Sequence, residues 1–306
     1  MKTKIRNQSL LIALLLLSQN LVMAQLEKFP AKIPKISLER AELRILHSEI
    51  IGQDYELFVS LPISYNQNNF SYPVIIGLDA YTGFLIMKGC VDAFTSLYPL
   101  MPEVIVVGIG YGGDESNSLA KWIAGRTRDF TPAQNSWTEE FYEKFITDRG
   151  LTTIDVQTGG ASLFLKFINN ELFPFLNSNY RINQENKILF GASLGGLFAF
   201  YTVFHEPETF NKYFIESPSL QYNNGITFQY EYDYSTNHSD LKMDIFMCAG
   251  ALEEEHSVNV KKMEELLLSR DYPHLNLETV IFDNEGHISC APAALSRGLI
   301  ELFNNE

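Results

Sequence analysis

The chain has 306 residues, of which 46% are hydrophobic and 20% are charged. These proportions are those of an ordinary globular protein and exclude long disorder, a collagen-like repeat and a coiled coil. The formal net charge of −14 disfavours binding to nucleic acid or to an anionic membrane, because both attract basic patches. A chain of this size can bury a large core, as one α/β domain or as two smaller domains.

The first 24 residues have the pattern of a signal peptide. Basic residues open the segment, residues 10–17 (LLIALLLL) are apolar, and residues 22–24 (VMA) supply small side chains before a cleavage site. The apolar run is shorter than the roughly 20 residues that span a bilayer. We therefore expect cleavage near Ala24 and a periplasmic or secreted protein without stable membrane insertion. The alternative is an uncleaved membrane anchor.

The cysteines give little guidance to the fold. Cys90, Cys248 and Cys290 are the three in the sequence, an odd number at scattered spacing. This pattern is neither a disulfide scaffold nor a zinc site. A disulfide between Cys248 and Cys290 stays open at this point.

Short apolar runs alternate with helical patterns along the rest of the chain. Residues 43–47 and 55–61 alternate in polarity and predict an antiparallel strand pair. Later runs are continuously apolar, as in parallel strands that are covered on both faces. The sequence thus predicts one three-layer α/β domain over residues 25–306, with a mostly parallel sheet of about eight strands. The continuous runs are residues 73–78, 104–109, 187–190, 245–248 and 277–282, and the helices are expected at 162–176, 194–204, 258–268 and 291–303.

Three local features depart from this alternation. Pro174 is expected to end or kink the helix at residues 162–176. Residues 133–158 and 221–239 place aromatic side chains among polar residues. Long connections in compact α/β domains are often lids or substrate walls, so we expect these two segments to border a site. The alternative is that their aromatic residues only pack against the domain.

The sequence GASLGG at residues 191–196 carries the strongest chemical signal. A bare G-x-S-x-G is common, but this one follows an apolar strand run and precedes a helix. That setting predicts Ser193 as a nucleophile on a tight turn. The Leu194 backbone N–H, at the start of the helix, is expected to bind the oxyanion. We assign the second oxyanion donor to the Tyr81 backbone N–H, after the strand at 73–78.

The base and the acid follow from chain order. An α/β-hydrolase places its nucleophile, acid and histidine in that order, with the histidine after the last strand. His287 fits this position, and His256 is the runner-up. Glu253, just after the strand at 245–248, is expected to orient the imidazole. Asp283 is a weaker alternative for the acid.

Assembled in this order, the motifs resemble the "putative esterase" family of α/β-hydrolases, and most closely its siderophore (enterochelin-type) esterase branch. The resemblance implies an α/β-hydrolase fold and cleavage of carboxylic ester bonds by Ser193 and His287 through an acyl-enzyme, without metal or organic cofactor. Some members of this branch work with little help from the acid, which leaves the weight of Glu253 open. The segments that carry the resemblance, within residues 41–302, are 55–59 (YELFV), 61–62 (LP), 78–79 (LD), 107–111 (VGIGY), 126–132 (RTRDFTP), 159–161 (GGA), 191–197 (GASLGGL), 217–220 (SPSL) and 285–287 (EGH).

The resemblance also suggests which residues bind a small-molecule ester. Arg126 or Arg128 is expected to hold an anionic or catecholate group, the alternative being a salt bridge from this segment to Asp129. Tyr222 follows the SPSL motif where relatives often carry Trp, and we expect it in the substrate cleft.

The family does not fix the substrate. A siderophore or related aromatic ester is the leading hypothesis, and a feruloyl or acetyl carbohydrate ester is the alternative. An acyl transferase would use the same residues. A non-catalytic binding module would be expected to lack the nucleophile, the base or the elbow glycines, and all of them are present. The oligomeric state stays open.

Overall fold

A computed structural model describes residues 37–96, 99–112 and 117–304. The predicted signal peptide lies outside the described residues. The chain divides into two units, Met1–Glu39 and Arg40–Glu306, and the second contains every strand and helix of the described chain. Its strands are β1 (Ala41–Ser48), β2 (Gln53–Ser60), β3 (Tyr72–Gly77), β4 (Ile105–Gly110), β5 (Ile182–Ala192), β6 (Lys212–Glu216), β7 (Met243–Gly250) and β8 (Leu275–Phe282).

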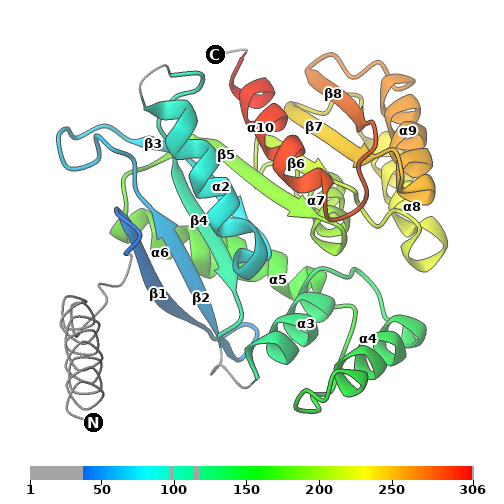
Figure 1. The fold of residues 1–306 in the computed structure, drawn as a ribbon. Coiled ribbons are helices and arrows are strands. Elements are labelled where there is room, and N and C mark those ends of the chain that lie inside the picture. The colour runs from blue at the N-terminus through cyan, green and yellow to red at the C-terminus, as the bar shows by residue number, and fades with distance from the viewer. Residues whose placement is uncertain (1–36, 97–98, 113–116, 305–306) are drawn as a thin grey trace, which may run out of the picture. The chain divides into compact units, whose positions relative to one another are not determined.

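The strands form one eight-stranded sheet in the order β1-β2-β4-β3-β5-β6-β7-β8 (Figure 1). Strand β2 runs antiparallel to β1 and to β4, and every other pair is parallel. The sheet confirms the predicted α/β-hydrolase architecture, including the antiparallel pair at its start. Gly77 at the end of β3 pairs with Phe190 near the end of β5, so the loops that follow these two strands leave the sheet together.

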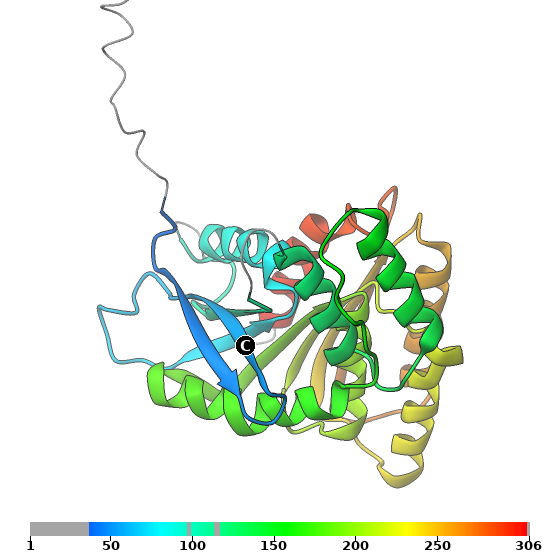
Figure 2. The ribbon, with the colours of Figure 1, turned by 90° about the horizontal axis from the view of Figure 1, so that it is seen from below.

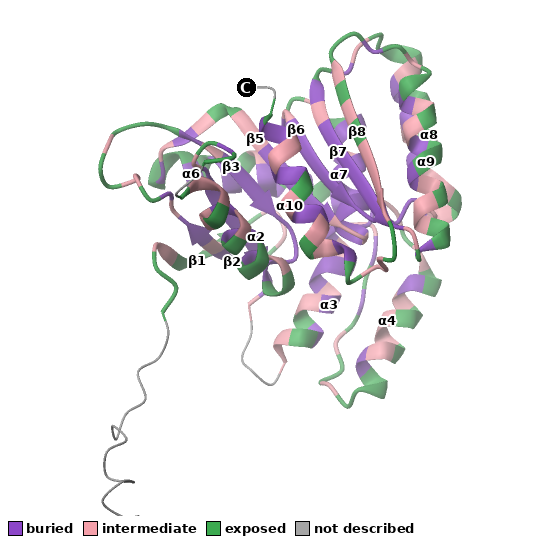
Figure 3. Cartoon of the chain, turned by 45° about the horizontal axis from the view of Figure 1, so that its top comes forward, coloured by how far each residue is buried: buried purple, intermediate pink, exposed green. Residues whose placement is uncertain are grey.

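Helices cover both faces of the sheet, which makes three layers (Figure 2). Helices α2 and α10 pack on one face, and α5, α6, α7 and α9 pack on the other. Burial is concentrated in the central strands, as expected from their continuous apolar runs (Figure 3). The helices are α2 (Ala80–Thr95), α3 (Ser118–Asp129), α4 (Ser136–Asp148), α5 (Ala161–Phe167), a π-helical turn η1 (Ile168–Leu172), α6 (Phe173–Asn179), α7 (Leu194–His205), α8 (Tyr222–Asn237), α9 (Glu254–Leu268) and α10 (Cys290–Phe303).

Strand β6 was not located by the sequence pattern. Its five residues, KYFIE, are all buried although they begin with Lys212 and end with Glu216. The Lys212 ammonium donates to the Leu302 carbonyl, so its charge is accommodated inside the domain. A buried strand that begins and ends with a charged residue does not appear in the sequence as a continuous apolar run.

Two segments that were interpreted as long connections contain helices. Residues 133–158 hold α4, and residues 221–239 hold α8, whose first turn is broken by left-handed backbone at Asn223, Asn224 and Gly225. Both helices bury few side chains, so their sequences lack a wide apolar stripe.

Of the two outcomes expected at Pro174, the helix does not end there, and the irregularity takes the form of a π-helical turn directly before the proline. The helical run continues to Asn179, because η1 precedes α6 and places Pro174 in the first turn of α6. A proline inside a helix removes one backbone hydrogen bond and crowds the preceding turn, and the wider π-helical turn relieves that crowding. Within the described ranges, no helix combines the length and the apolar character needed to cross a membrane.

Candidate active site

The GASLGG segment forms a tight turn between β5 and α7, the position that the motif predicts for a nucleophile elbow. Ser193 has φ 58° and ψ −116°, a strained conformation for a residue with a side chain. A Cβ on Gly191 would lie 2.2 Å from the Gly195 carbonyl oxygen, and a Cβ on Gly196 would lie 2.9 Å from Pro218 Cα. The turn therefore requires glycine at both positions.

Hydrogen bonds fix the backbone of Ser193 on both sides. Its N–H donates to the Glu216 carbonyl at 2.9 Å, and its carbonyl accepts from the Ser219 N–H at 3.0 Å. The Ser219 hydroxyl lies 3.4 Å from Ser193 Oγ, so a second hydroxyl stands beside the predicted nucleophile. In the sequence, Ser219 stands out only as a member of the SPSL motif, and the spacing along the chain gives no sign of this contact.

Two helix N-termini converge at the elbow. Leu194 is the first residue of α7 and Tyr81 is the second residue of α2, positions at which a backbone N–H has no intrahelical acceptor. A Cβ on Gly195 would lie 3.4 Å from Leu78 Cδ1, so the start of α7 packs against the loop that leads into α2. This arrangement is compatible with two oxyanion donors, and the roles of Leu194 and Tyr81 stay predictions.

A buried ion pair holds the loop before α2. Asp79 caps α2 in a left-handed conformation (φ 57°) and accepts from Arg126 Nε at 2.8 Å, from Arg126 Nη2 at 3.0 Å and from Trp122 Nε1 at 2.7 Å. Arg126 is 7% exposed. A bound ester could reach this guanidinium only if the pair with Asp79 opened. The substrate role of Arg126 stays a prediction, and its observed contact instead braces the loop that carries Tyr81.

Arg128 has different partners from Arg126. Its Nε donates to Asp129 Oδ1 at 2.7 Å, which is the salt bridge given as the alternative interpretation. Arg128 also lines a cavity of about 630 Å³ together with Glu56, Lys121 and Asp155. Its role in substrate binding stays a prediction.

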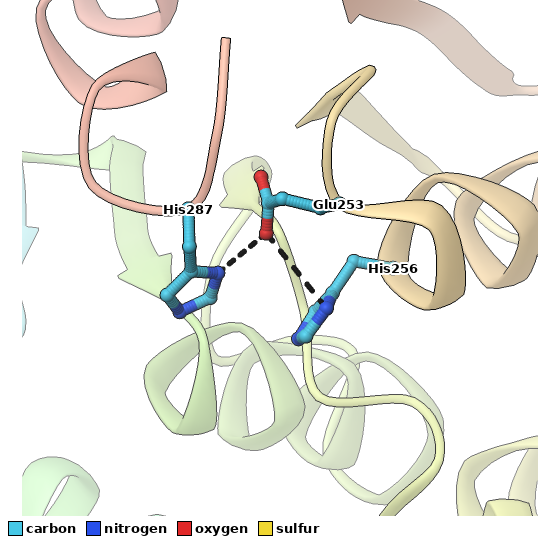
Figure 4. Close-up of side chains that lie close together, drawn as sticks. All are labelled: Glu253, His256 and His287. Atoms are coloured by element: carbon cyan, nitrogen blue, oxygen red, sulfur yellow. Dashed lines mark hydrogen bonds and ion pairs between the residues drawn. The ribbon is translucent and has the colours of Figure 1, made fainter.

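The predicted acid and the predicted base meet at the ends of β7 and β8. Glu253 Oε2 accepts a hydrogen bond of 2.5 Å from His287 Nδ1 (Figure 4). Glu253 Oε1 accepts from Ser217 Oγ at 2.7 Å and from the Gly250 N–H at 2.9 Å. Burial alone would raise the pKa of Glu253, but these hydrogen bonds, the one from His287 foremost, outweigh burial and lower it. An ionised Glu253 can thus orient the imidazole.

The chain matches the family described as "Putative esterase" over residues 48–160 and 155–276. It belongs to this family. The ferri-bacillibactin esterase BesA of Bacillus subtilis (strain 168) is 30% identical over 271 residues, which cover 84% of this chain and 88% of BesA. The siderophore enterobactin esterase of Emericella nidulans is 41% identical over 178 residues, 56% of this chain and 55% of that protein.

Solved structures agree with this membership. The crystal structure of the BES protein from Bacillus cereus aligns with a TM-score of 0.73 at 27% identity, over 89% of this chain and 98% of that chain. The protein is therefore an esterase, a hydrolase of carboxylic ester bonds, as the motifs predicted.

A second histidine lies beside Glu253, the predicted acid. His256 Nδ1 lies 3.7 Å from Glu253 Oε2, and the rings of His256 and His287 are 4.9 Å apart (Figure 4). Burial, and then the charge of His287, lower the pKa of His256. The runner-up for the base thus contacts the same carboxylate as His287.

Glu253, His256 and His287 could also hold a metal ion. Their ligand atoms all lie within 4.8 Å of one another, and they are residue types that bind zinc. A metal there would occupy the imidazole that base catalysis needs. The expectation that the reaction uses no metal stays a prediction.

A buried carboxyl lies beneath the elbow. Glu216, at the end of β6, is 1% exposed, and its Oε2 has no hydrogen-bond partner among the described residues. Burial raises the pKa of Glu216 to about 7. The sequence pattern gave no reason to single out Glu216. Nearby, Cys248 and Cys290 are buried free thiols rather than a disulfide.

A cavity of about 360 Å³ opens beside the elbow. Leu194 and Ser219 form its floor on the elbow side, and α4 and the start of α8 form its walls. Tyr222, predicted to line the substrate cleft, is one of the lining residues. The two segments expected to border a site therefore do border this cavity.

Proposed function

We propose that the protein is an exported serine esterase that cleaves the ester bonds of a siderophore or a related aromatic ester. The observation that carries this proposal is the pairing of a strained Ser193 elbow with the Glu253–His287 hydrogen bond, at one end of the same parallel strands. The names of two relatives, a ferri-bacillibactin esterase and a siderophore enterobactin esterase, support the substrate class.

The geometry supports an acyl-enzyme mechanism. Glu253 engages His287 Nδ1, which leaves Nε2 to take the Ser193 proton as Oγ attacks the ester carbonyl. The Leu194 and Tyr81 N–H groups then stabilise the tetrahedral oxyanion. His287 returns the proton to the leaving alcohol and afterwards activates the water that releases the acid.

The proposal that the protein is exported rests on the sequence of the first 24 residues alone. We propose cleavage near Ala24 and release of the mature protein into the periplasm or the medium. Intact-mass measurement of the protein from a periplasmic or culture fraction tests this. A mass that retains residues 1–24 would contradict it.

The test of function uses mature protein recovered after expression of the full chain. It measures hydrolysis of an iron-free catecholate trilactone, p-nitrophenyl acetate and p-nitrophenyl butyrate, with Ser193→Ala as the control. We expect rapid trilactone cleavage, and a loss of at least about 10³-fold in kcat in the variant. Full activity in Ser193→Ala, or no turnover of any ester, would contradict the proposal.

One observation also favours a second candidate, an esterase of feruloylated carbohydrates. The aromatic side chains of the cavity beside Ser193 suit a feruloyl ring as well as a catechol ring. A feruloylated sugar cleaved much faster than the trilactone would favour this candidate. An acetyl esterase would instead cleave p-nitrophenyl acetate and leave the trilactone intact. An acyl transferase would form a new ester when an alcohol is added to the assay.

A further inference from the structure

The cavity beside the elbow has an aromatic wall that the fold does not need. Trp137 and Phe141, one turn apart on α4, are 71% and 48% exposed. Their rings stack at 5.5 Å between centroids with 17° between planes. Both line the cavity that also contains Leu194 and Ser219. Large aromatic side chains left exposed beside a nucleophile are typical of a binding surface.

The side chains that line the cavity are also uncharged. None of its lining residues in the described part of the chain is Lys, Arg, Asp or Glu, although the whole chain carries a net charge of −14. Its polar groups are amides and hydroxyls, which donate to or accept from phenols. The lining residue Gln221 has a buried Oε1 without a hydrogen-bond partner among the described residues. The lining is Asn135, Trp137, Thr138, Phe141, Tyr142, Leu194, Ser219, Gln221, Tyr222, Asn223 and Asn224.

The walls are tied together before any ligand binds. Asn135 Nδ2 donates to Asn223 Oδ1 at 2.9 Å, and the Tyr222 hydroxyl donates to the Ala133 carbonyl at 2.7 Å. These bonds join the start of α4 to the start of α8. A preformed pocket loses less conformational entropy on binding than one that must be ordered by its ligand.

We propose that this cavity binds an uncharged aromatic acyl group of the substrate, with Trp137 and Phe141 contacting its ring. The inference rests on the proposed ester hydrolysis by Ser193 and names the part of the substrate that the enzyme selects. At about 360 Å³ the cavity lies at the small end of ligand pockets and fits one aromatic arm.

The uncharged lining of the cavity also predicts a preference between the ferric and the iron-free substrate. In a ferric catecholate trilactone the three rings are deprotonated and bound to the metal, so the complex is anionic and no ring is free to enter a pocket. An uncharged lining offers such an anion no compensation for its lost hydration. The esterase therefore selects the iron-free ester, in contrast to the ferric substrate named for its relative BesA.

The experiment compares three p-nitrophenyl esters that differ only in the acyl group. These are the esters of N-benzoylglycine, N-acetylglycine and N-(4-sulfobenzoyl)glycine. We expect the benzoyl ester to have a kcat/KM at least about 10-fold above that of the other two. Trp137→Ala and Phe141→Ala should each lower the benzoyl-to-acetyl ratio about 3- to 10-fold, the range expected for lost aromatic contacts. Phe70→Ala is the matched control, because Phe70 is 70% exposed in the loop before β3; it should leave the ratio unchanged.

The outcomes separate this inference from the proposed function. Equal kcat/KM for the benzoyl and acetyl esters, or an unchanged ratio in both α4 variants, would overturn the acyl pocket while leaving the esterase intact. A kcat/KM for the sulfobenzoyl ester equal to that for the benzoyl ester would overturn the proposed selection against charged rings. A ferric trilactone cleaved as fast as the iron-free form would do the same. Failure of the proposed function would appear instead as activity that survives Ser193→Ala.

Discussion

The residues proposed for catalysis and those proposed for substrate selection lie in regions built on opposite physical principles. At the strand ends, Glu253 is buried and accepts three hydrogen bonds, and Ser193 is held in strained backbone. Across the cavity, Trp137 and Phe141 are exposed and uncharged on a helix that buries few side chains. Charge and strain position the groups that react, whereas exposed aromatic surface can vary without disturbing them.

This comparison predicts two classes of variant. Changes at the strand ends should slow the cleavage of every ester by a similar factor, because they alter the reacting groups. Changes on α4 should alter the ratio between esters, because they alter only what binds beside Ser193. A variant on α4 that slowed all esters alike would break the distinction.

The largest expected effect is that of the acid. Glu253→Gln should lower kcat about 10²- to 10⁴-fold on all esters, because a neutral amide stabilises the imidazolium less and can favour the wrong tautomer. Steady-state rates with p-nitrophenyl butyrate measure this loss. Asp283→Asn is the control, since Asp283 was the alternative acid, and it should change kcat less than about twofold. A large loss in Asp283→Asn with none in Glu253→Gln would exchange the two roles.

The next effect is expected at the loop that carries Tyr81. Arg126→Ala leaves Asp79 buried without its partner, and should lower the free energy of unfolding by about 3–5 kcal/mol. Denaturant unfolding measures this change. Arg297→Ala removes an exposed pair with Glu301 and should cost less than about 1 kcal/mol. Similar losses in the two variants would show that the Asp79 pair does not brace the loop.

A smaller effect concerns pH and stability. Because burial raises the pKa of Glu216 from its ordinary value of 4.5 to about 7, the folded protein binds this proton more tightly than the unfolded chain. Its contribution is fully present below pH 4.5 and is lost as the pH rises to about 7, a difference of about 3 kcal/mol.

The matched variant is Glu216→Gln, which cannot ionise. The difference in unfolding free energy between variant and wild type should shift in favour of the variant by up to about 3 kcal/mol from pH 4.5 to pH 8. Parallel pH profiles of the two proteins would rule out Glu216 as the titrating group.

The smallest expected effect is that of metal removal. If His287 acts as a base beside Glu253, chelation by EDTA should change kcat/KM less than about twofold. Added zinc tests the same residues by inhibition, because a metal bound to His256 and His287 would block the base. Loss of activity in EDTA, restored by zinc, would replace the serine mechanism with a metal-dependent one.

The sequence predicted the features that depend on neighbouring residues or on strand order. The elbow needs glycines close to Ser193 in the chain, and Glu253 and His287 follow consecutive strands, so a local pattern was enough to find them. Contacts such as Asp79 with Arg126, or His256 with His287, join residues 47 and 31 positions apart and leave no periodic signal. Strand β6 was missed for a related reason, because its Lys212 is accommodated by the distant Leu302 carbonyl, which composition does not reveal. Helices α4 and α8 were missed because they bury few side chains and so lack a wide apolar stripe.

Covalent labelling of the nucleophile tests the proposed role of Ser193 most directly. The mature protein is treated with a fluorophosphonate, digested, and mapped by mass spectrometry, with and without prior saturation by the benzoyl ester. We expect one phosphonylated residue, Ser193, which should be protected by the ester and unlabelled in Glu253→Gln over the same short interval. Labelling at another residue, or none at Ser193 in an active preparation, would contradict that role.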